Sequence, residues 1–455
     1  MSTAASTTLL AAPSPDAGTP RLRWWAVALF LFGCFFLAVQ DMASPTLWQD
    51  NGDADIAGWV NRVDGGQAKR QIGFLALAAF GCLGLILPSR RTDIDADEVS
   101  PYWPVLFPLI VFVGWGYLSI LWSHDRSLTA KRLIVFTAIW TSVVTLLKHF
   151  GLRNFVGFIV VYATLTLLVG IFAELKVGVF GEVASEPYRF AGTMSPNHSA
   201  LTACMLAIAC TYLLTSKLDL TRVQWLGLVA LAVVAGLVVF FTRSRTALAA
   251  GMLGVGAILA LRLRPAWSIV VAVGGILMAL VIAFGYEARL FGEVWEVALM
   301  GRTTSDVRTL TGRTDIWAFA LEHAVRDPTR LVTGFGYDSF WNAANTEAIS
   351  RRVGFTISEA HNAYLEVLLG TGMIGAVAWL LMLTMGLWYH LSRGRLDSGR
   401  WSPDSALAIG VIAMASLHGL AEVAFTHAQV PTMVLLACIA VAAFQSNTHG
   451  EEGQA

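Results

Sequence analysis

The chain has 455 residues, of which 56% are hydrophobic and only 14% are charged, and its formal net charge is zero. Soluble proteins carry about 25% charged residues, so this composition excludes an ordinary soluble enzyme and indicates an integral membrane protein. A chain without net charge has no global field that would attract nucleic acid. All five cysteines lie in apolar runs without a Cys-x-x-Cys pair, so they are interpreted as small buried hydrophobic residues.

Twelve apolar runs are each long enough to cross a bilayer, which takes about 20 residues in a helix. They predict an all-α polytopic membrane protein with about 12 transmembrane helices. The first run follows two arginines and has no cleavage site after it, which favours a retained span. The runs lie near 24–40, 71–88, 102–122, 131–147, 154–174, 198–216, 222–242, 245–261, 266–285, 362–391, 404–420 and 428–444.

An even number of spans places both termini on one side of the membrane. The short segments on that side hold 13 Lys and Arg residues, against 10 on the opposite short loops. The positive-inside rule therefore favours cytoplasmic termini. The predicted organisation is a disordered cytoplasmic tail at 1–23, helices 1–9 over 24–285, a long periplasmic loop with short helices at about 286–360, helices 10–12 over 361–444, and a cytoplasmic tail at 445–455.

Three arginine-bearing stretches fall on the predicted outer face. They are "YRFAGTMSPNHSA" with Arg189 and Asn197, "FTRSRTA" with Arg243 and Arg245, and "TGRTDIW" with Arg313. A guanidinium is always charged, and its planar fork of donors matches phosphate oxygens. For any single arginine, snorkelling to the lipid head groups is the alternative. Three such stretches on one face favour binding of a lipid-linked diphosphate at the membrane boundary.

The stretch "SEAHNAYLEVLLGTGMIG" places His361 at the mouth of an apolar run. Thr356 and Glu359 have the spacing of a capping box, so a helix is predicted to begin near Ile357, with His361 in its first turn. The positive end of the helix dipole disfavours an imidazolium there. A neutral imidazole at the membrane surface is suited to act as a general base toward a hydroxyl.

Two further polar residues follow His361 on the same predicted helix. Asn362 and Glu366 are four residues apart and share a face, whereas His361 and Glu366 are separated by about 140° around the helix, which argues against a direct dyad. Glu366 lies where an ionisable group is expensive and is therefore a candidate functional residue. The glycines of "GTGMIG" (370–375) are predicted to let a neighbouring helix approach closely.

Patterns that could bind a metal ion are weak. "DNGDAD" at 50–55 could hold a cation beside a diphosphate, and "DIDADE" at 93–98 lacks the glycine that a calcium loop requires. His418, Glu422 and His427 have no recognisable zinc spacing and are interpreted as the polar lining of a cavity. The prediction is that the protein uses no metal ion and no cofactor.

With these residues in view, the chain resembles the O-antigen ligase and O-antigen polymerase family of bacterial membrane glycosyltransferases. The resemblance covers roughly residues 100–440 and includes the layout of twelve spans with one long loop before the tenth. Each of its motifs is weak alone, and together they are fairly specific. The motifs are "HNAYLEVLLGTGMIG", "RFAGTMSPNHSA", "TRSRTA", "GRTDIW" and "GFGYDSF".

The resemblance implies transfer of a glycan from a polyprenyl diphosphate to an acceptor hydroxyl, with inversion, without metal or nucleotide. His361 would correspond to the essential histidine and would orient or deprotonate the acceptor hydroxyl. Arg245 and Arg313 would stabilise the departing diphosphate as catalytic arginines, and Arg189 would match the arginine before the "GT…PN" motif. The remaining predicted substrate-binding residues are Arg243, Asn197, Asn362 and Glu366.

The predicted protein is thus an O-antigen ligase in the inner membrane of a Gram-negative bacterium, with its active site facing the periplasm. Its expected donor is O-antigen on undecaprenyl diphosphate, its acceptor is lipid A–core, and it contacts membrane lipids but no nucleic acid. A polymerase of the same family remains open, although the compact long loop and the H-N-x9-G-x-x-G spacing favour the ligase. A transporter of lipid-linked glycan or solute is the alternative of another class, but transporters usually show two similar halves, which this sequence lacks.

Overall fold

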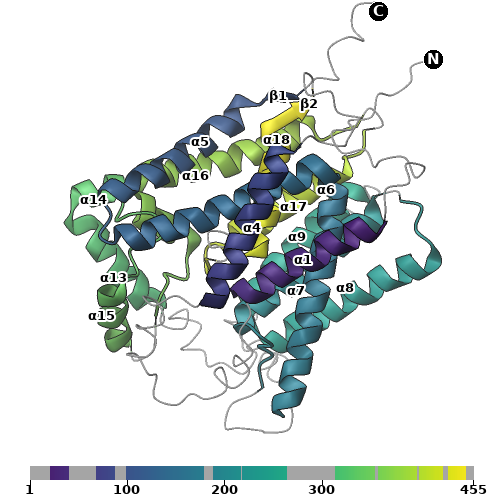
Figure 1. Ribbon diagram of the computed structural model, residues 1–455, viewed down its shortest axis with the longest axis horizontal. Helices are drawn as coiled ribbons and strands as arrows, with labels where there is room; N and C mark the ends of the chain where they lie inside the picture. Colours follow the sequence, from purple (N-terminus) through teal and green to yellow (C-terminus); the bar gives the residue numbers. More distant parts are fainter. Residues whose placement is uncertain are drawn as a thin grey trace, which may run out of the picture.

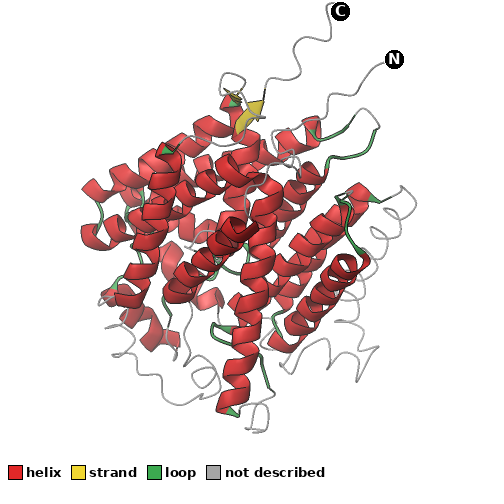
Figure 2. Ribbon diagram, turned by 45° about the vertical axis from the view of Figure 1, so that its right-hand side comes forward, coloured by secondary structure: helices red, strands yellow, loops and turns green. Residues whose placement is uncertain are grey.

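Long apolar helices form most of the protein, and a group of short helices lies at one side of them (Figure 1). In the described part of the chain the helices are accompanied by one antiparallel ribbon, β1 (Val99–Pro101) with β2 (Phe444–Ser446), which Figure 2 shows in yellow. This computed structural model describes residues 21–39, 68–87, 99–178, 188–216, 218–263, 313–353, 357–396, 399–423 and 429–446.

The helices follow the predicted apolar runs closely. Those before residue 264 are α1 (Arg21–Val39), α4 (Ala68–Ile86), α5 (Trp103–Leu118), η2 (Ser119–Leu121), α6 (Arg126–Val177), α7 (Pro196–Thr215), α8 (Arg222–Thr242) and α9 (Arg245–Arg262). The later ones are α13 (Arg313–Arg326), α14 (Pro328–Thr333), α15 (Ala343–Val353), α16 (Ala363–Arg393), α17 (Pro403–His418) and α18 (Val430–Ala443). The prediction of an all-α membrane protein is confirmed.

Seven of the described helices are long and apolar enough to cross a membrane by length and composition, and α1, α17 and α18 are shorter apolar helices. The element α6 contains two predicted spans, because its 52 residues turn at Gly151, whose φ of 74° and ψ of 168° are not helical. The ninth predicted run, 266–285, and much of the long loop lie outside the described residues. The count of twelve spans and the bounds of the loop therefore stay predictions.

The connections between helices meet at two opposite ends of the bundle, as expected of spans that alternate in direction. At one end the side chain of Arg189 donates from Nε to the carbonyl of Thr242 across 3.2 Å. At the other end Tyr212 donates to Asp404 across 2.7 Å, and β1 pairs with β2. We call the first of these the site end; it contains the beginnings of α7, α9 and α16 and the ends of α8 and α17. Which end faces the cytoplasm stays a prediction.

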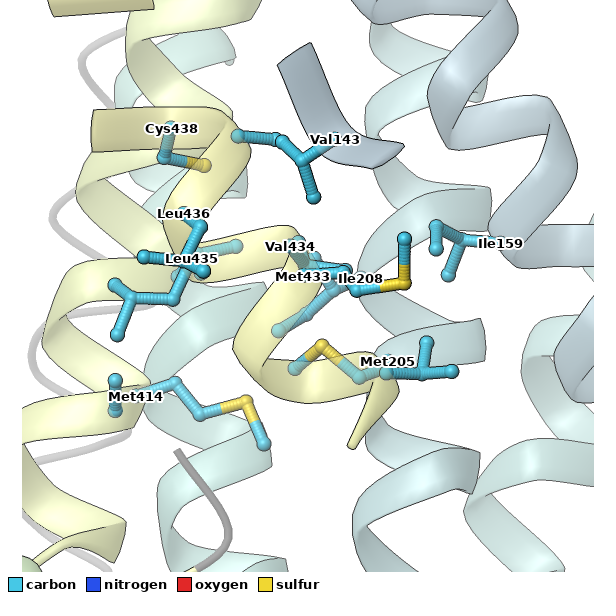
Figure 3. Close-up of a cluster of buried hydrophobic side chains, with 14 of the residues drawn as sticks. Val143, Ile159, Met205, Ile208, Met414, Met433, Val434, Leu435, Leu436 and Cys438 are labelled. Carbon is cyan, nitrogen blue, oxygen red and sulfur yellow. The ribbon is translucent and has the colours of Figure 1, made fainter. Parts of the chain in front are cut away.

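The hydrophobic core lies where α6, α7, α17 and α18 meet. Figure 3 shows Met205 and Ile208 of α7 beside Val434 of α18, and all three side chains are less than 5% exposed. In α7, 72% of the residues in the most apolar 18-residue stretch are buried, whereas only 22% are buried in the corresponding stretches of α4 and α8. Helix α7 is therefore central, and α4 and α8 leave most of their apolar surface outward, as helices in contact with lipid do.

Helix α16 is broken inside the predicted tenth span. At Gly372 the backbone adopts φ 66° and ψ −170°, a conformation that favours glycine. A break of this kind frees backbone carbonyls, which must find other donors in an apolar environment. The carbonyls of Leu369 and Gly370 accept from the backbone amides of Phe335 and Gly336, across 2.8 and 3.1 Å. The side chain of Trp115 donates to the next carbonyl, that of Thr371, across 2.9 Å.

The glycines around this break allow α14 and the residues directly after it to approach α16 closely. A Cβ atom at Gly334 would lie 2.4 Å from the carbonyl oxygen of Gly370, and one at Gly372 would lie 2.2 Å from that of Val332. The predicted close approach of a neighbouring helix is therefore present: the partners are Val332 of α14 and Gly334, the first residue of the "GFGYDSF" motif. The close approach places the "GFGYDSF" segment beside the helix that carries Glu366.

Candidate functional site

The carboxylate of Glu422 collects donors from three separate elements at the site end. It forms an ion pair with Arg313, the first residue of α13, and its side chain is only 4% exposed. Asn197 in the first turn of α7 donates from Nδ2 across 2.6 Å. His361, which precedes α16, lies with Nδ1 3.1 Å from the second oxygen of Glu422. Arg313, Asn197 and His361, which the sequence predicted as separate site residues, thus meet at Glu422. Glu422 itself was not predicted as a site residue.

His361 lies outside the helix that was predicted to contain it. Helix α16 begins at Ala363, and its N-cap is Asn362, whose side chain accepts from the amide of Leu365 across 2.9 Å. The expected helix start near Ile357 is therefore wrong, and Thr356 of the supposed capping box lies outside the described residues. His361 itself has a φ of 48°, in the left-handed region that non-glycine residues seldom adopt.

The environment of His361 favours the imidazolium, contrary to the expected neutral base. Burial disfavours the charged ring, but Glu359 and Glu422 outweigh burial and raise the pKa of His361 to about 10. Burial would raise the pKa of Glu422, yet the hydrogen bond and charge of His361, with the charge of Arg313, hold it below its ordinary value. The helix dipole that was expected to keep the ring neutral is outweighed because two carboxylates lie 3.1 Å from Nδ1.

Glu359, His361 and Glu422 could also serve as metal ligands, since their ligand atoms lie within 4.8 Å of one another. Arg313 already forms an ion pair with Glu422, and the raised pKa of His361 makes it a second cation. The two negative charges are therefore matched by two positive charges of the protein itself. The acidic run 50–55, the run 93–98 and His427 lie outside the described residues.

Glu366 and Asn362 engage the protein rather than open space. The side chain of Glu366 is 5% exposed, and its Oε2 accepts from the indole of Trp341 and from the amide of Ala360, each across 2.9 Å. Asn362 donates from Nδ2 to the carbonyl of Leu420 across 3.1 Å, in addition to capping α16. Their predicted contact with substrate stays a prediction, whereas their contacts with the backbone beside His361 are present.

The other three predicted arginines lie around the turn between α8 and α9. Arg243 ends α8 with a φ of 54°, and Arg245 is the first residue of α9. Arg189 reaches the same turn through its bond to the carbonyl of Thr242. All three arginines are partly exposed, so a ligand can approach them.

A buried carboxylate that sequence reasoning missed fixes the segment that carries Arg189. Glu174 of α6 is fully buried, and its Oε1 accepts from the amides of Ala191 and Gly192 across 2.7 and 2.6 Å. Its Oε2 accepts from the hydroxyl of Tyr188 across 2.5 Å. An ionisable residue at the end of an apolar run was the available signal, because such a group is costly in a membrane unless it has partners.

Comparison with known proteins identifies the region that holds most of these residues. The model of the O-antigen ligase family matches residues 229–380, which include Arg243, Arg245, Arg313 and His361 but neither Arg189 nor Glu422. The chain is also similar to the exopolysaccharide production protein ExoQ of Rhizobium meliloti (strain 1021), with 24% identity over 372 residues, 75% of this chain and 77% of that protein. The resemblance that the motifs indicated is thereby confirmed: over residues 229–380 the chain matches the O-antigen ligase family.

Proposed function

We propose that the protein is a metal-independent, inverting O-antigen ligase, which transfers glycan from undecaprenyl diphosphate to a hydroxyl of lipid A–core at the periplasmic face of the inner membrane. The observation that carries this proposal is the meeting of Arg313 and His361 on the buried carboxylate of Glu422, at one end of an apolar helix bundle. Lipid-borne donors and acceptors present their polar groups at that boundary, so both substrates can reach one site.

The arginines suit the leaving group of this reaction. In the transfer, the bond between the anomeric carbon and the diphosphate oxygen breaks, and the electron pair stays on the diphosphate. Arg245 and Arg313 are the proposed catalytic cations, since preorganised positive charge stabilises an anion as it develops. Arg189 and Arg243, at the same end, are proposed to hold the diphosphate through paired N–H donors.

His361 is the proposed general base. The oxygen of the acceptor hydroxyl attacks the anomeric carbon from the side opposite the diphosphate, and the hydroxyl proton passes to the neutral form of His361. Glu359 and Glu422 stabilise the imidazolium that results, because both carboxylates lie 3.1 Å from Nδ1. The same two carboxylates keep the imidazole of His361 protonated in most molecules of the resting protein. The rate of the reaction therefore depends on pH.

The direct test is a transfer assay with purified protein, undecaprenyl-diphosphate-linked glycan and lipid A–core, with and without a chelator. Glycan should appear on lipid A–core in both conditions, and His361→Ala should abolish transfer while the protein is made and inserted normally. A transporter would keep its function in His361→Ala. Loss of transfer on chelation would contradict the metal-independent mechanism and direct attention to Asp53 and Asp55.

Polymerisation of an exopolysaccharide is the second candidate function, favoured by the similarity to ExoQ. The chemistry at the anomeric carbon would be the same, and only the acceptor would differ. Offering lipid A–core and a second undecaprenyl-diphosphate-linked glycan in one reaction separates the two candidates. Product only on the second lipid-linked glycan would replace the ligase with a polymerase.

A further inference from the structure

Three sequence stretches contribute residues other than Arg313 and His361 that converge on the backbone of Ala360. The "TGRTDIW" motif contributes Trp317, the residue that follows "GFGYDSF" is Trp341, and the "HNAYLE" stretch contributes Glu366. Ala360 directly precedes His361 and is fully buried. Residues from α13, from the segment after α14 and from α16 thus converge on the backbone immediately before the proposed base.

The contacts hold the Ala360 residue from both of its polar groups. Its amide donates to Oε2 of Glu366 across 2.9 Å, and its carbonyl accepts from the indole of Trp317 across 2.9 Å. Trp341, itself fully buried, donates to the same Oε2 of Glu366 across 2.9 Å. A carboxyl oxygen can accept more than one hydrogen bond, so Oε2 of Glu366 anchors both donors at once.

His361 needs such an anchor because its backbone is in an unfavourable conformation. Its φ of 48° lies in the left-handed region, which a non-glycine residue occupies only when its surroundings impose it. On the other side of His361, the side chain of Asn362 is bonded to Leu420 and the amide of Ala363 donates to Gly419 across 2.8 Å. Contacts on both sides of His361 therefore hold its backbone in this conformation, with the imidazole beside Glu422.

The "GFGYDSF" segment fixes the distance between Trp341 and Glu366. Its amides at Phe335 and Gly336 occupy the carbonyls that the break in α16 leaves free, one turn below Glu366. Asp338 of the same segment forms an ion pair with Arg132 of α6, with 2.5 Å between Oδ1 and Nη1. The segment is therefore bonded to both α16 and α6, and Trp341 follows it directly in the chain.

We infer that Glu366 and Trp317 are positioning residues that clamp the Ala360 residue and thereby hold the imidazole of His361 against Glu422. Trp341 supports the clamp through Glu366. This assigns to the "GFGYDSF" segment, and to Trp317 of the "TGRTDIW" motif, a task that does not require contact with substrate. The kinetic expectation rests on the proposed function, but the geometry of His361 can be tested without it.

The test measures two quantities in parallel on Glu366→Ala, Glu366→Gln and Trp317→Phe. The first is the acylation rate of His361 by diethyl pyrocarbonate at pH 7, followed by peptide mass spectrometry; the reagent attacks only the unprotonated ring. The second is kcat and KM for glycan transfer. Glu366→Ala and Trp317→Phe should raise the acylation rate at least about tenfold, because His361 leaves its two carboxylates and its unprotonated fraction at pH 7 increases. They should lower kcat about a hundredfold with little change in KM.

Two variants control for indirect effects. Glu366→Gln keeps an oxygen that can accept from both Ala360 and Trp341, so its acylation rate and kcat should lie closer to the wild type than those of Glu366→Ala. Trp122→Phe removes an indole bond of the same kind, 3.2 Å long and directed at the carbonyl of Thr333, and should change neither quantity.

Unchanged acylation of His361 in Glu366→Ala or in Trp317→Phe would overturn the clamp, and so would a Glu366→Gln variant that behaves like Glu366→Ala. If the wild type shows no transfer at all, the proposed function fails, while the acylation rates still decide the clamp. A Glu366→Ala variant that cannot be folded leaves the decision to Trp317→Phe and Glu366→Gln.

Discussion

The rate of glycan transfer should increase with pH through the neutral range, because only the neutral form of His361 can take the acceptor proton. The two neighbouring carboxylates raise the pKa of His361 to about 10. At pH 7 the neutral form is then about one molecule in a thousand, and each further pH unit increases it about tenfold. A plot of the logarithm of kcat/KM against pH should therefore rise with a slope near one and bend close to pH 10, since kcat/KM reports the groups of the free enzyme.

Glu422→Gln changes this profile in a defined direction. The substitution keeps the shape of the side chain and removes one of the two negative charges near Nδ1 of His361. Loss of one opposite charge at this distance lowers the pKa of the histidine by about 1 to 3. The bend in the profile should move from near pH 10 to between about pH 7 and 9, even if the weaker hold on Arg313 lowers the limiting rate.

The profile is measured as the initial rate of transfer between pH 6 and 10.5 with purified protein in detergent. Glu347→Gln is a matched control, because Glu347 also faces an arginine, Arg351, but at an exposed position on α15. Its profile should bend where that of the wild type does. The reasoning would be refuted by a wild-type rate that falls as the pH rises, by a bend near pH 6.5, or by a bend that Glu422→Gln leaves in place.

Three further outcomes are expected. Arg313→Lys retains the charge but loses the planar guanidinium, so kcat in the transfer assay should fall about 10- to 100-fold. This corresponds to the loss of about 1.5–3 kcal/mol from a charged hydrogen bond. An unchanged kcat would show that Arg313 takes no part in the reaction. Gly372→Ala should destabilise the protein by at least about 2 kcal/mol, because its φ is 66° and the new Cβ would clash with the carbonyl oxygen of Val332. Gly114→Ala is the control, since a Cβ atom there would meet open space, and equal thermal unfolding temperatures of the two variants would contradict this account. Transfer should persist in excess chelator, as the charges around Glu422 are balanced within the protein; loss of activity that added divalent ions restore would refute this.

The helices could be predicted from the sequence because each is encoded by a contiguous apolar run. Helix α8 begins at Arg222 and ends at Thr242, the bounds that the run 222–242 predicted. The start of α16 was misplaced because Thr356 and Glu359 have the spacing of a capping box. Asn362 takes the N-cap instead, and the left-handed His361 precedes it. Competing caps within a few residues of one another are resolved by tertiary contacts, which no local pattern contains.

Arg313 and His361 could be predicted as site residues from their chemical type and position, but Glu422, which contacts both, could not. Arg313 and His361 stood out as ionisable residues beside apolar runs. Glu422 follows His361 by 61 residues and joins it only when α16 and α17 pack side by side. It was noted in the sequence as part of a polar cluster with His418, and spacing along the chain could not show which of its neighbours it would contact. Long-range pairing is the information that a single sequence lacks.

The break in α16 fixes how many residues can stand between the proposed base and the glycines. A residue inserted between Glu366 and Gly372 would rotate everything before it by about 100° relative to the inner part of the helix. Glu366 would then face away from Ala360 and Trp341, or else the carbonyls at the break would lose Phe335 and Gly336. The number of residues in this stretch is therefore fixed by the structure. Side chains along it can be exchanged, but an insertion or deletion would separate His361 from Glu359 and Glu422.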